Sequence, residues 1–241
     1  MKTPETIQQE YYRATAHQYD ALHMEEDREH NVALKYVSGL IGSLGISSIL
    51  DVGCGTGRAM KHFIKCNPTI KVHGIEPVEE LIEQAVHNNL VPSSAITRAF
   101  GQALPFANSS FDATCEFGVL HHVKEPNLVV QEMMRVSRKA IFLSDENRFA
   151  HGRIHSKLAK LALYKLGIFH GAYYLKTFGR GYRFSEGDGL AYSYSVFDSF
   201  EILSQWADRI ILIPTNSEKP PSWLHPLLTS FHVLLCAVRD S

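Results

Sequence analysis

Short apolar runs alternate with amphipathic helical stretches through the middle of the chain. Aliphatic and β-branched residues predict strands at residues 46–52, 71–75, 95–100, 111–117 and 140–144. Between these strands, apolar residues spaced three or four apart predict helices at residues 58–65, 77–89 and 128–136. Strands that alternate with helices form right-handed βαβ units. Residues 46–145 therefore predict an α/β fold, a doubly wound and mostly parallel sheet.

The flanking segments follow other patterns. Residues 5–44 predict helix, and residues 150–195 lose the alternation and are rich in glycine and aromatic residues. Residues 197–207 predict a helix, and residues 209–213 and 231–238 predict two late strands. The link between these strands contains Pro214, Pro220, Pro221 and Pro226, which we expect to exclude regular sheet.

We divide the chain into four parts on this basis. Residues 1–45 form an N-terminal helical segment, and residues 46–147 form a core that carries a glycine-rich loop. Residues 148–196 form a cap inserted after the fifth strand, and residues 197–241 return to the core with a helix and a final strand hairpin.

Composition excludes several classes of protein. Among 241 residues, 24 are Lys or Arg and 25 are Asp or Glu, which gives a net charge of −1. A nucleic-acid coat needs a positive field, so DNA is not an expected partner. No apolar run reaches the roughly 18 residues of a membrane helix, and the first residues lack the apolar region of a secretory signal. We therefore expect a cytoplasmic protein, in which the four cysteines form no disulfide framework.

A glycine-rich loop follows the first strand, with the sequence Asp-Val-Gly-Cys-Gly-Thr-Gly at residues 51–57. A dinucleotide fingerprint places its third glycine at position 58, which is Arg58 in this chain. The carboxylate of Asp51 would repel a pyrophosphate, and it favours a cation. Glu76 ends the second strand and is placed to accept hydrogen bonds from a ribose. The expected cofactor is a nucleoside with a positive tail and no phosphate, and S-adenosylmethionine meets these demands.

Further motifs follow in order along the chain. Five successive segments resemble the motifs of class I S-adenosylmethionine-dependent methyltransferases of the small-molecule type. They are residues 49–57, Glu76, residues 104–106 (Leu-Pro-Phe), residues 111–112 (Phe-Asp) and residues 120–123 (Leu-His-His-Val). Residues 16–20 resemble the N-terminal tyrosine-containing motif of the same family, so the resemblance covers residues 11–145. It implies a Rossmann-like, seven-stranded sheet whose last strand is antiparallel.

The resemblance also implies a set of cofactor-binding residues. By this resemblance, the methionine part of the cofactor would be held by Asp51, Gly53 and Gly55, and the ribose by Glu76. The adenine would lie near Gln102 and Ala103, and the sulfonium above Phe117 and Gly118. The N-terminal motif would add Tyr19. Family members often carry an acidic residue near the adenine. This chain has Phe100 there, so adenine contact is expected from Gln102 or from backbone groups.

Two histidines follow the fourth strand, at the mouth of the expected ligand crevice. Methyl transfer to oxygen needs a base with a pKa near the working pH, and imidazole titrates in that range. Asp145 ends the adjacent fifth strand and could orient His121 and stabilise its protonated form. We predict His121 and Asp145 as the catalytic pair. The alternative is that one of His121 and His122 only shapes the cofactor pocket.

The cap carries an unbalanced charge. Between Arg148 and Arg183 there are eight Lys or Arg residues and no Asp or Glu. Apolar residues from Ile154 to Ala162 predict one face of a helix, which either packs on the core with its lysines exposed or lies on an anionic membrane or an acidic partner. Residues 185–195 predict a closing loop or an ordinary surface loop.

A cap of this kind roofs the active site, as the resemblance implies. Arginines among aromatic residues suit an acceptor that bears a carboxylate, phosphate or sulfate beside a ring or an acyl chain. The predicted substrate-binding residues are His122, Arg148, Tyr173, Arg180 and Tyr192.

The sequence thus predicts methyl transfer to a small molecule, with a hydroxyl as the expected acceptor. The alternatives are N- or C-methylation of a small or lipid-linked acceptor, tRNA methylation, and a non-catalytic S-adenosylmethionine-binding protein. We predict no metal, because His151 and His155 stand four apart without an evident third ligand.

Overall fold

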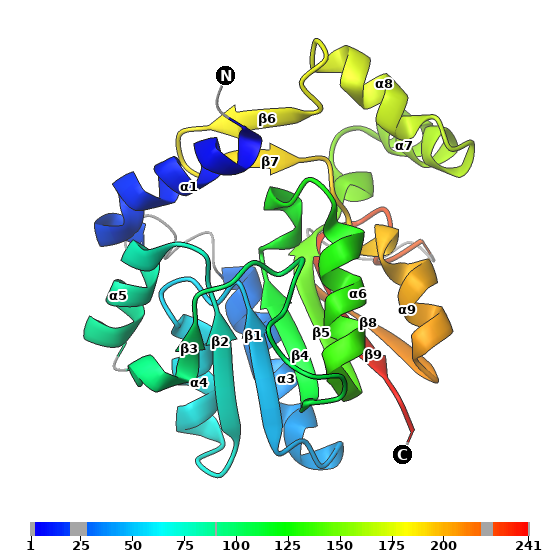
Figure 1. Ribbon diagram of the computed structural model, residues 1–241. Helices are drawn as coiled ribbons and strands as arrows, with labels where there is room; N and C mark the ends of the chain where they lie inside the picture. Colours follow the sequence, from blue (N-terminus) through cyan, green and yellow to red (C-terminus); the bar gives the residue numbers. More distant parts are fainter. Residues whose placement is uncertain (1–2, 20–27, 90, 218–223, 241) are drawn as a thin grey trace.

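A seven-stranded sheet forms the centre of the computed structural model, which describes residues 3–19, 28–89, 91–217 and 224–240 (Figure 1). The strand order is β3-β2-β1-β4-β5-β9-β8, and β9 runs antiparallel to both of its neighbours. The strands are β1 (Ser48–Val52), β2 (Lys71–Ile75), β3 (Ile96–Thr97), β4 (Phe111–Phe117), β5 (Ser137–Glu146), β8 (Arg209–Ser217) and β9 (Ser230–Val238). The predicted Rossmann-like sheet with an antiparallel last strand is therefore confirmed.

Helices cover both faces of this sheet (Figure 1). The α-helices are α1 (Pro4–Thr15), α3 (Arg28–Ser43), α4 (Arg58–Cys66), α5 (Glu79–His87), α6 (Pro126–Val136), α7 (Ile154–Lys165), α8 (Phe169–Lys176) and α9 (Phe200–Trp206). Short 3₁₀ turns include η1 (Ala16–Gln18), η3 (Leu120–His122) and η4 (Arg148–Ala150). Of the helix predicted over residues 5–44, residues 20–27 lie outside the described part of the chain.

Side chains that alternate along the central strands build two separate cores. In β5, Ile141 and Leu143 pack with α6 and α9 on one face, whereas Ala140 and Phe142 pack with α3 and α4 on the other. Successive side chains of a strand point to opposite faces, so a strand buried on both sides needs a continuous apolar run. This requirement explains why the short apolar runs of the sequence predicted the positions of the central strands.

Two predictions about strands were wrong. The strand predicted over residues 95–100 is only Ile96–Thr97, because β3 is an edge strand that pairs with the end of β2 alone. Pro214 lies inside β8, opposite Val233, although we expected the prolines to exclude regular sheet. The other edge of the sheet is β8, where a missing N–H is tolerated, and its pairing is irregular just after Pro214. Pro220 and Pro221 lie outside the described residues.

The segment between β5 and η5 (Val196–Asp198) stands above the carboxyl ends of the strands. It contains α7, α8 and a hairpin of β6 (Tyr182–Ser185) and β7 (Gly189–Tyr192), so part of the tract expected to be a loop forms paired strands. The hairpin lies beside α1, which packs against β7 (Figure 1). None of the helices in the described residues has the length and apolar character needed to cross a membrane.

Candidate active site

The glycine-rich loop makes a tight turn between β1 and α4. Gly53 has a φ of +74°, and a Cβ at this position would lie 2.6 Å from a methyl group of Val119. The backbone N–H groups of Gly53 and Cys54 both donate to the carbonyl oxygen of Ile75, 2.9 Å away. Only glycine combines this conformation with so close an approach. The loop is thereby held at the carboxyl end of β1 and leaves open space above it.

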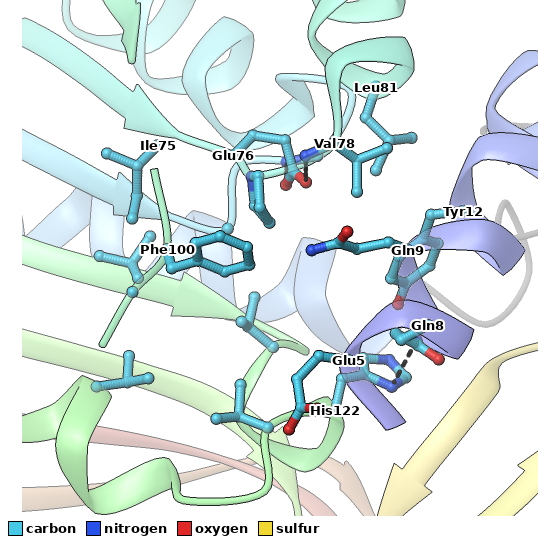
Figure 2. A pocket seen from close by; sticks show the side chains of 18 of the residues that line it. Glu5, Gln8, Gln9, Tyr12, Ile75, Glu76, Val78, Leu81, Phe100 and His122 are labelled. Carbon is cyan, nitrogen blue, oxygen red and sulfur yellow. Dashed lines mark hydrogen bonds between the residues drawn. The ribbon is translucent and has the colours of Figure 1, made fainter. Parts of the chain in front are cut away.

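A cavity lies over this loop, and Figure 2 shows the side chains around it. Seven of the predicted cofactor-binding residues line it, namely Tyr19, Gly53, Gly55, Glu76, Gln102, Phe117 and Gly118. Ala103 is exposed and is not among the lining residues. Phe100 lines the cavity, so an apolar ring stands where relatives often carry an acidic residue.

The roof of this cavity comes from α1, which the sequence analysis did not connect with the site. Glu5, Gln8, Gln9 and Tyr12 all line the cavity from this helix. In Figure 2, Gln9 and Tyr12 lie across the cavity from Phe100. The N-terminal segment offered only a helical pattern and one tyrosine motif, so nothing local indicated which face of α1 covers a ligand.

Two buried carboxyl groups belong to the site. Both oxygens of Glu76 accept backbone hydrogen bonds, Oε2 from Gly55 and Oε1 from Val78, each at 3.0 Å. Burial raises the pKa of Glu76 to about 7, despite these two hydrogen bonds. Burial also raises the pKa of Asp51 to about 7, with a hydrogen bond from Cys115 opposing the shift and the charge of Glu76 adding to it. Asp51 lies in β1 just before the loop, is 2% exposed and is not among the residues that line the cavity.

The donor set fits S-adenosylmethionine. Asp51 Oδ2 is buried and has no hydrogen-bond partner among the described residues, which leaves it able to pair with a cationic group of a ligand. Gly53 and Gly55 keep the floor of the cavity free of side chains, and Glu76 presents a fixed carboxylate to a ribose. Phe100 and Val129 supply apolar surface for an adenine ring. These residues would hold the cofactor.

His121 and Asp145 form a buried pair that is not among the residues lining this cavity, whereas the adjacent His122 lines it. The Nδ1–H group of His121 donates to Asp145 Oδ1 at 2.7 Å, and the backbone N–H groups of Leu120 and His121 donate to Asp145 Oδ2. Asp145 is fully buried, and although burial opposes it, the His121 charge holds the pKa of Asp145 below its usual value. Burial alone would lower the pKa of His121, but Asp145 and Asp188 raise it well above the ordinary value. Strand pairing between β4 and β5 brings the two residues together as predicted from the sequence.

Asp188 lies near both histidines, and no pattern in the sequence indicated this position. It lies in the turn of the β6–β7 hairpin, with Oδ2 at 3.6 Å from Nε2 of His121 and Oδ1 at 3.4 Å from Nε2 of His122. Nδ1 of His122 donates to the carbonyl oxygen of Leu190 at 2.6 Å. Both Nε2 atoms therefore face one carboxylate. The ligand atoms of these three side chains lie within 4.8 Å of one another, close enough to share a metal ion.

Gln8 ties the hairpin to this site. Its Oε1 accepts from the N–H of Leu190 at 2.5 Å, and its Nε2 donates to the carbonyl oxygen of Asp188 at 3.5 Å. Gly189 has a φ of +73°, and a Cβ there would lie 2.7 Å from Gln8 Oε1. The hairpin turn is thus fixed against α1 with Asp188 directed at the two histidines. A glycine-rich tract was visible in the sequence, but its partners were not.

A second cavity lies between the hairpin, α7, α8 and the end of β5. Of the predicted substrate-binding residues, Arg148, Tyr173 and Tyr192 line it, together with His151 of the histidine pair considered above. His122 lines the cofactor cavity instead, and Arg180 is exposed and lines neither. Gly189 lines the second cavity, so the hairpin turn with Asp188 separates the two spaces.

Positive charge dominates the walls of this second cavity. The lining residues include four that carry a positive charge, Arg148, Lys160, Lys176 and Arg183, and one that carries a carboxylate, Glu146. Arg148 is buried, pairs with Asp198 and lies with its guanidinium 4.5 Å from the ring centroid of Phe169. Burial, followed by the charges of Lys157, Arg148 and Lys176, lowers the pKa of Lys160 to about 8. A ligand anion would relieve this crowding of cations.

A family model matches part of the chain. The model is described as a methyltransferase domain and covers residues 50–142, which carry most of β1, all of β2 to β4 and most of β5. Because the match spans less than half of the chain, it shows a methyltransferase domain over these residues. The cavity over the glycine-rich loop of this domain fits S-adenosylmethionine, as described above.

Particular relatives share part of the sequence or the whole fold. The O-methyltransferase resE of Aspergillus sclerotiorum is 31% identical over 106 residues, 42% of this chain and 40% of that protein. An uncharacterised methyltransferase of Schizosaccharomyces pombe is 30% identical over 99 residues, 37% of this chain and 36% of that protein. These matches thus span two fifths or less of each relative's length.

Magnesium protoporphyrin IX methyltransferase from Synechocystis PCC 6803, solved with bound SAH, superposes with a TM-score of 0.60 at 16% identity, covering 99% of this chain and 100% of that one. A Thermotoga maritima protein described as a possible histamine N-methyltransferase gives a TM-score of 0.59 at 15% identity, covering 96% of this chain and 99% of that one. At these identities the likeness concerns the fold.

Proposed function

We propose that this chain methylates a hydroxyl group of a small molecule that also carries an anionic group. S-adenosylmethionine supplies the electrophilic methyl group when it is bound. The chain must then bind the acceptor and accept the proton of its hydroxyl. The observation that carries the proposal is the buried His121–Asp145 pair, since His121 is next in sequence to His122, which lines the cofactor cavity. The match to an O-methyltransferase over part of the chain agrees with it.

His121 acts as the base in this proposal. Because Nδ1 donates to Asp145, the neutral imidazole has its lone pair on Nε2, on the side away from Asp145. When Nε2 accepts the acceptor's proton, the ion pair with Asp145 stabilises the imidazolium. Asp145 and Asp188 together raise the pKa of His121, so the imidazole keeps its proton while Asp188 faces Nε2. When Asp188 turns away, one of these two charges is removed and the pKa of His121 falls toward the working pH, where Nε2 can accept a proton.

The acceptor binds in the second cavity, beneath the cap of residues 148–196. Lys160, Lys176 and Arg183 would pair with its anionic group, and Tyr173 and Tyr192 would pack on an adjoining ring or chain. In the described structure the turn with Asp188 lies between this cavity and the cofactor cavity. The side chain of Asp188 must therefore turn away from Nε2 of His121 before an acceptor hydroxyl can reach it, while Gln8 holds the backbone of the hairpin turn.

The test is the variant His121→Ala, compared with His87→Ala in the exposed last turn of α5. Each protein is incubated with methyl-labelled S-adenosylmethionine and a small-molecule extract. Loss of a general base lowers turnover by about 10²–10⁴-fold, so His121→Ala should label no product although it still binds the cofactor, and His87→Ala should behave like the parent. The labelled product should bind to an anion-exchange resin. Unchanged labelling by His121→Ala would assign the reaction to an acceptor that needs no base, such as an amine.

A further inference from the structure

The outer surface of the cap is unusually apolar. Six large apolar side chains of α7, α8 and their turns are about half or more exposed, namely Ile154, Leu158, Leu166, Ile168, Leu175 and Phe178. We call this set the outer cap surface. Leu166, Leu175 and Phe178 are 71%, 77% and 91% exposed. Single exposed apolar residues are normal on protein surfaces, but a concentration in one small region indicates an interaction site.

The first cap helix, α7, has its apolar face turned outward. In α7, Ser156, Lys160 and Leu163 line the second cavity, at spacings of four and three residues that define the inner face. Ile154 and Leu158 lie on the opposite face and are exposed. A cap helix packed on the core would show the reverse arrangement. Every side chain of α7 remains at least partly exposed, so the core-packing alternative considered from the sequence is wrong for this stripe.

The chain just after α8 holds an aromatic side chain in solvent. Phe178 has a φ of +54°, in the left-handed region that is unfavourable for a bulky residue. Its side chain is 91% exposed, so burial within the chain does not offset this cost. The N–H groups of Phe178 and Gly179 donate to the carbonyl oxygens of Leu175 and Tyr174, so capping hydrogen bonds of α8 hold this conformation and keep the phenyl ring in solvent.

The charged residues of the segment that carries the outer cap surface are all basic. Residues 148–183 contain eight Lys or Arg and no Asp or Glu. Lys157 and Lys160 donate to the carbonyl oxygens of Leu228 and His151, so their ammonium groups are turned toward the body of the protein. Arg153, Lys165 and Arg180 are exposed. A partner of the outer cap surface must therefore carry negative charge and apolar material together.

We propose that the outer cap surface binds the anionic face of a lipid bilayer, with α7 and α8 lying on the headgroup region. Leu166, Ile168 and Phe178 project from turns at the edge of the molecule, where Figure 1 places α7 and α8 away from the sheet. A bilayer accepts such separate protrusions because it has no fixed shape, whereas a protein partner needs a matching pocket for each. Basic residues beside them pair with anionic headgroups.

Binding in this orientation would place the second cavity close to the membrane, since its walls include the inner faces of the same two helices. The proposal concerns a surface outside both cavities, and it holds whether or not the acceptor is a hydroxyl. Membrane binding and methyl transfer can thus fail separately in experiments.

The experiment is flotation of the full chain with vesicles of phosphatidylcholine alone or with added phosphatidylserine. The parent should bind only the vesicles that contain phosphatidylserine, and high salt should release it. Replacing Arg153, Lys165 and Arg180 with Gln should weaken binding by roughly a hundredfold, at about fivefold for each charge. The matched control replaces the exposed residues Lys35, Lys65 and Lys71 with Gln and should retain binding.

The apolar contribution is tested separately. The double variant Leu175→Ser with Phe178→Ser should weaken vesicle binding at least about tenfold, because both side chains would leave the headgroup region. Ile64→Ser with Leu128→Ser is the control, since these residues are 39% and 42% exposed on the core. Thermal unfolding establishes that each variant is folded. Equal vesicle binding by test and control variants, or no binding of the parent to phosphatidylserine, would overturn the proposal.

Discussion

The affinity for S-adenosylmethionine should depend on the protonation of Asp51. Its carboxyl group is buried, Oδ2 has no partner among the described residues, and burial raises its pKa to about 7. A carboxyl group pairs with a cationic cofactor only when ionised, and deprotonation is opposed by the buried environment in the free protein. Binding therefore has to release the proton, so affinity falls as the pH falls.

The size of this effect follows from the pKa. With a pKa of about 7, roughly one molecule in eleven has Asp51 ionised at pH 6, against about ten in eleven at pH 8. If the cofactor binds only the ionised form, the apparent Kd rises about tenfold between pH 8 and pH 6, which corresponds to about 1.4 kcal/mol. Burial also raises the pKa of Glu76 to about 7, so its titration can add to the pH dependence of cofactor affinity. The tenfold factor is the contribution of Asp51 alone.

Isothermal titration with S-adenosylmethionine at several pH values measures this contribution. The variant Asp51→Asn should bind more weakly at pH 8, and its affinity should change about tenfold less than that of the parent between pH 8 and pH 6. The comparison cancels the titration of the cofactor itself. Glu83→Gln, an exposed carboxylate-to-amide change on α5, is the control and should keep the parent's dependence. A full pH dependence in Asp51→Asn would refute the role assigned to Asp51.

Three further predictions concern the rest of the site and the fold. Asp188 raises the pKa of His121, so Asp188→Asn should move the acid limb of the kcat/KM pH profile to lower pH, and an unmoved limb would separate Asp188 from the base. Although burial opposes it, hydrogen bonds from Ser47 and Arg138 lower the pKa of Asp112 to about 2. The stabilisation from Asp112 is therefore fully present above the ordinary pKa of a carboxyl group and is lost as the pH falls from there through about 2. Asp112→Asn should lower the free energy of unfolding by roughly 1–3 kcal/mol at neutral pH and by less in acid, as measured by urea denaturation. Dialysis against a chelator should leave methyl transfer unchanged; a loss reversed by zinc would instead assign Asp188 and the two histidines to a metal ion.

Much of the core could be predicted from the sequence because its signals are local. Strands buried on both faces must be continuously apolar, and β2 and β4 have the predicted bounds. The residues that floor the cofactor cavity lie at strand ends, where sheet pairing alone brings them together. Edge positions were predicted less well, since β3 is shorter than expected and β8 accepts Pro214. At an edge, fewer neighbours constrain the chain, so pattern and structure agree less closely.

The cap and the roof of the site depend on contacts between residues far apart in the chain, for which no local pattern exists in the sequence. Gln8 meets Leu190 and Asp188 across about 180 positions, and Asp188 meets His121 across 67. The orientation of α7 could not be read from its stripe of apolar residues, because such a stripe predicts burial against something without saying what. The inner side of α7 borders the second cavity, and Ser156 and Lys160 line this cavity from the inner face of the helix. Because the polar face of α7 lines the cavity, its apolar face points outward. The orientation that gives the second cavity its basic wall therefore also exposes the apolar residues of the outer cap surface.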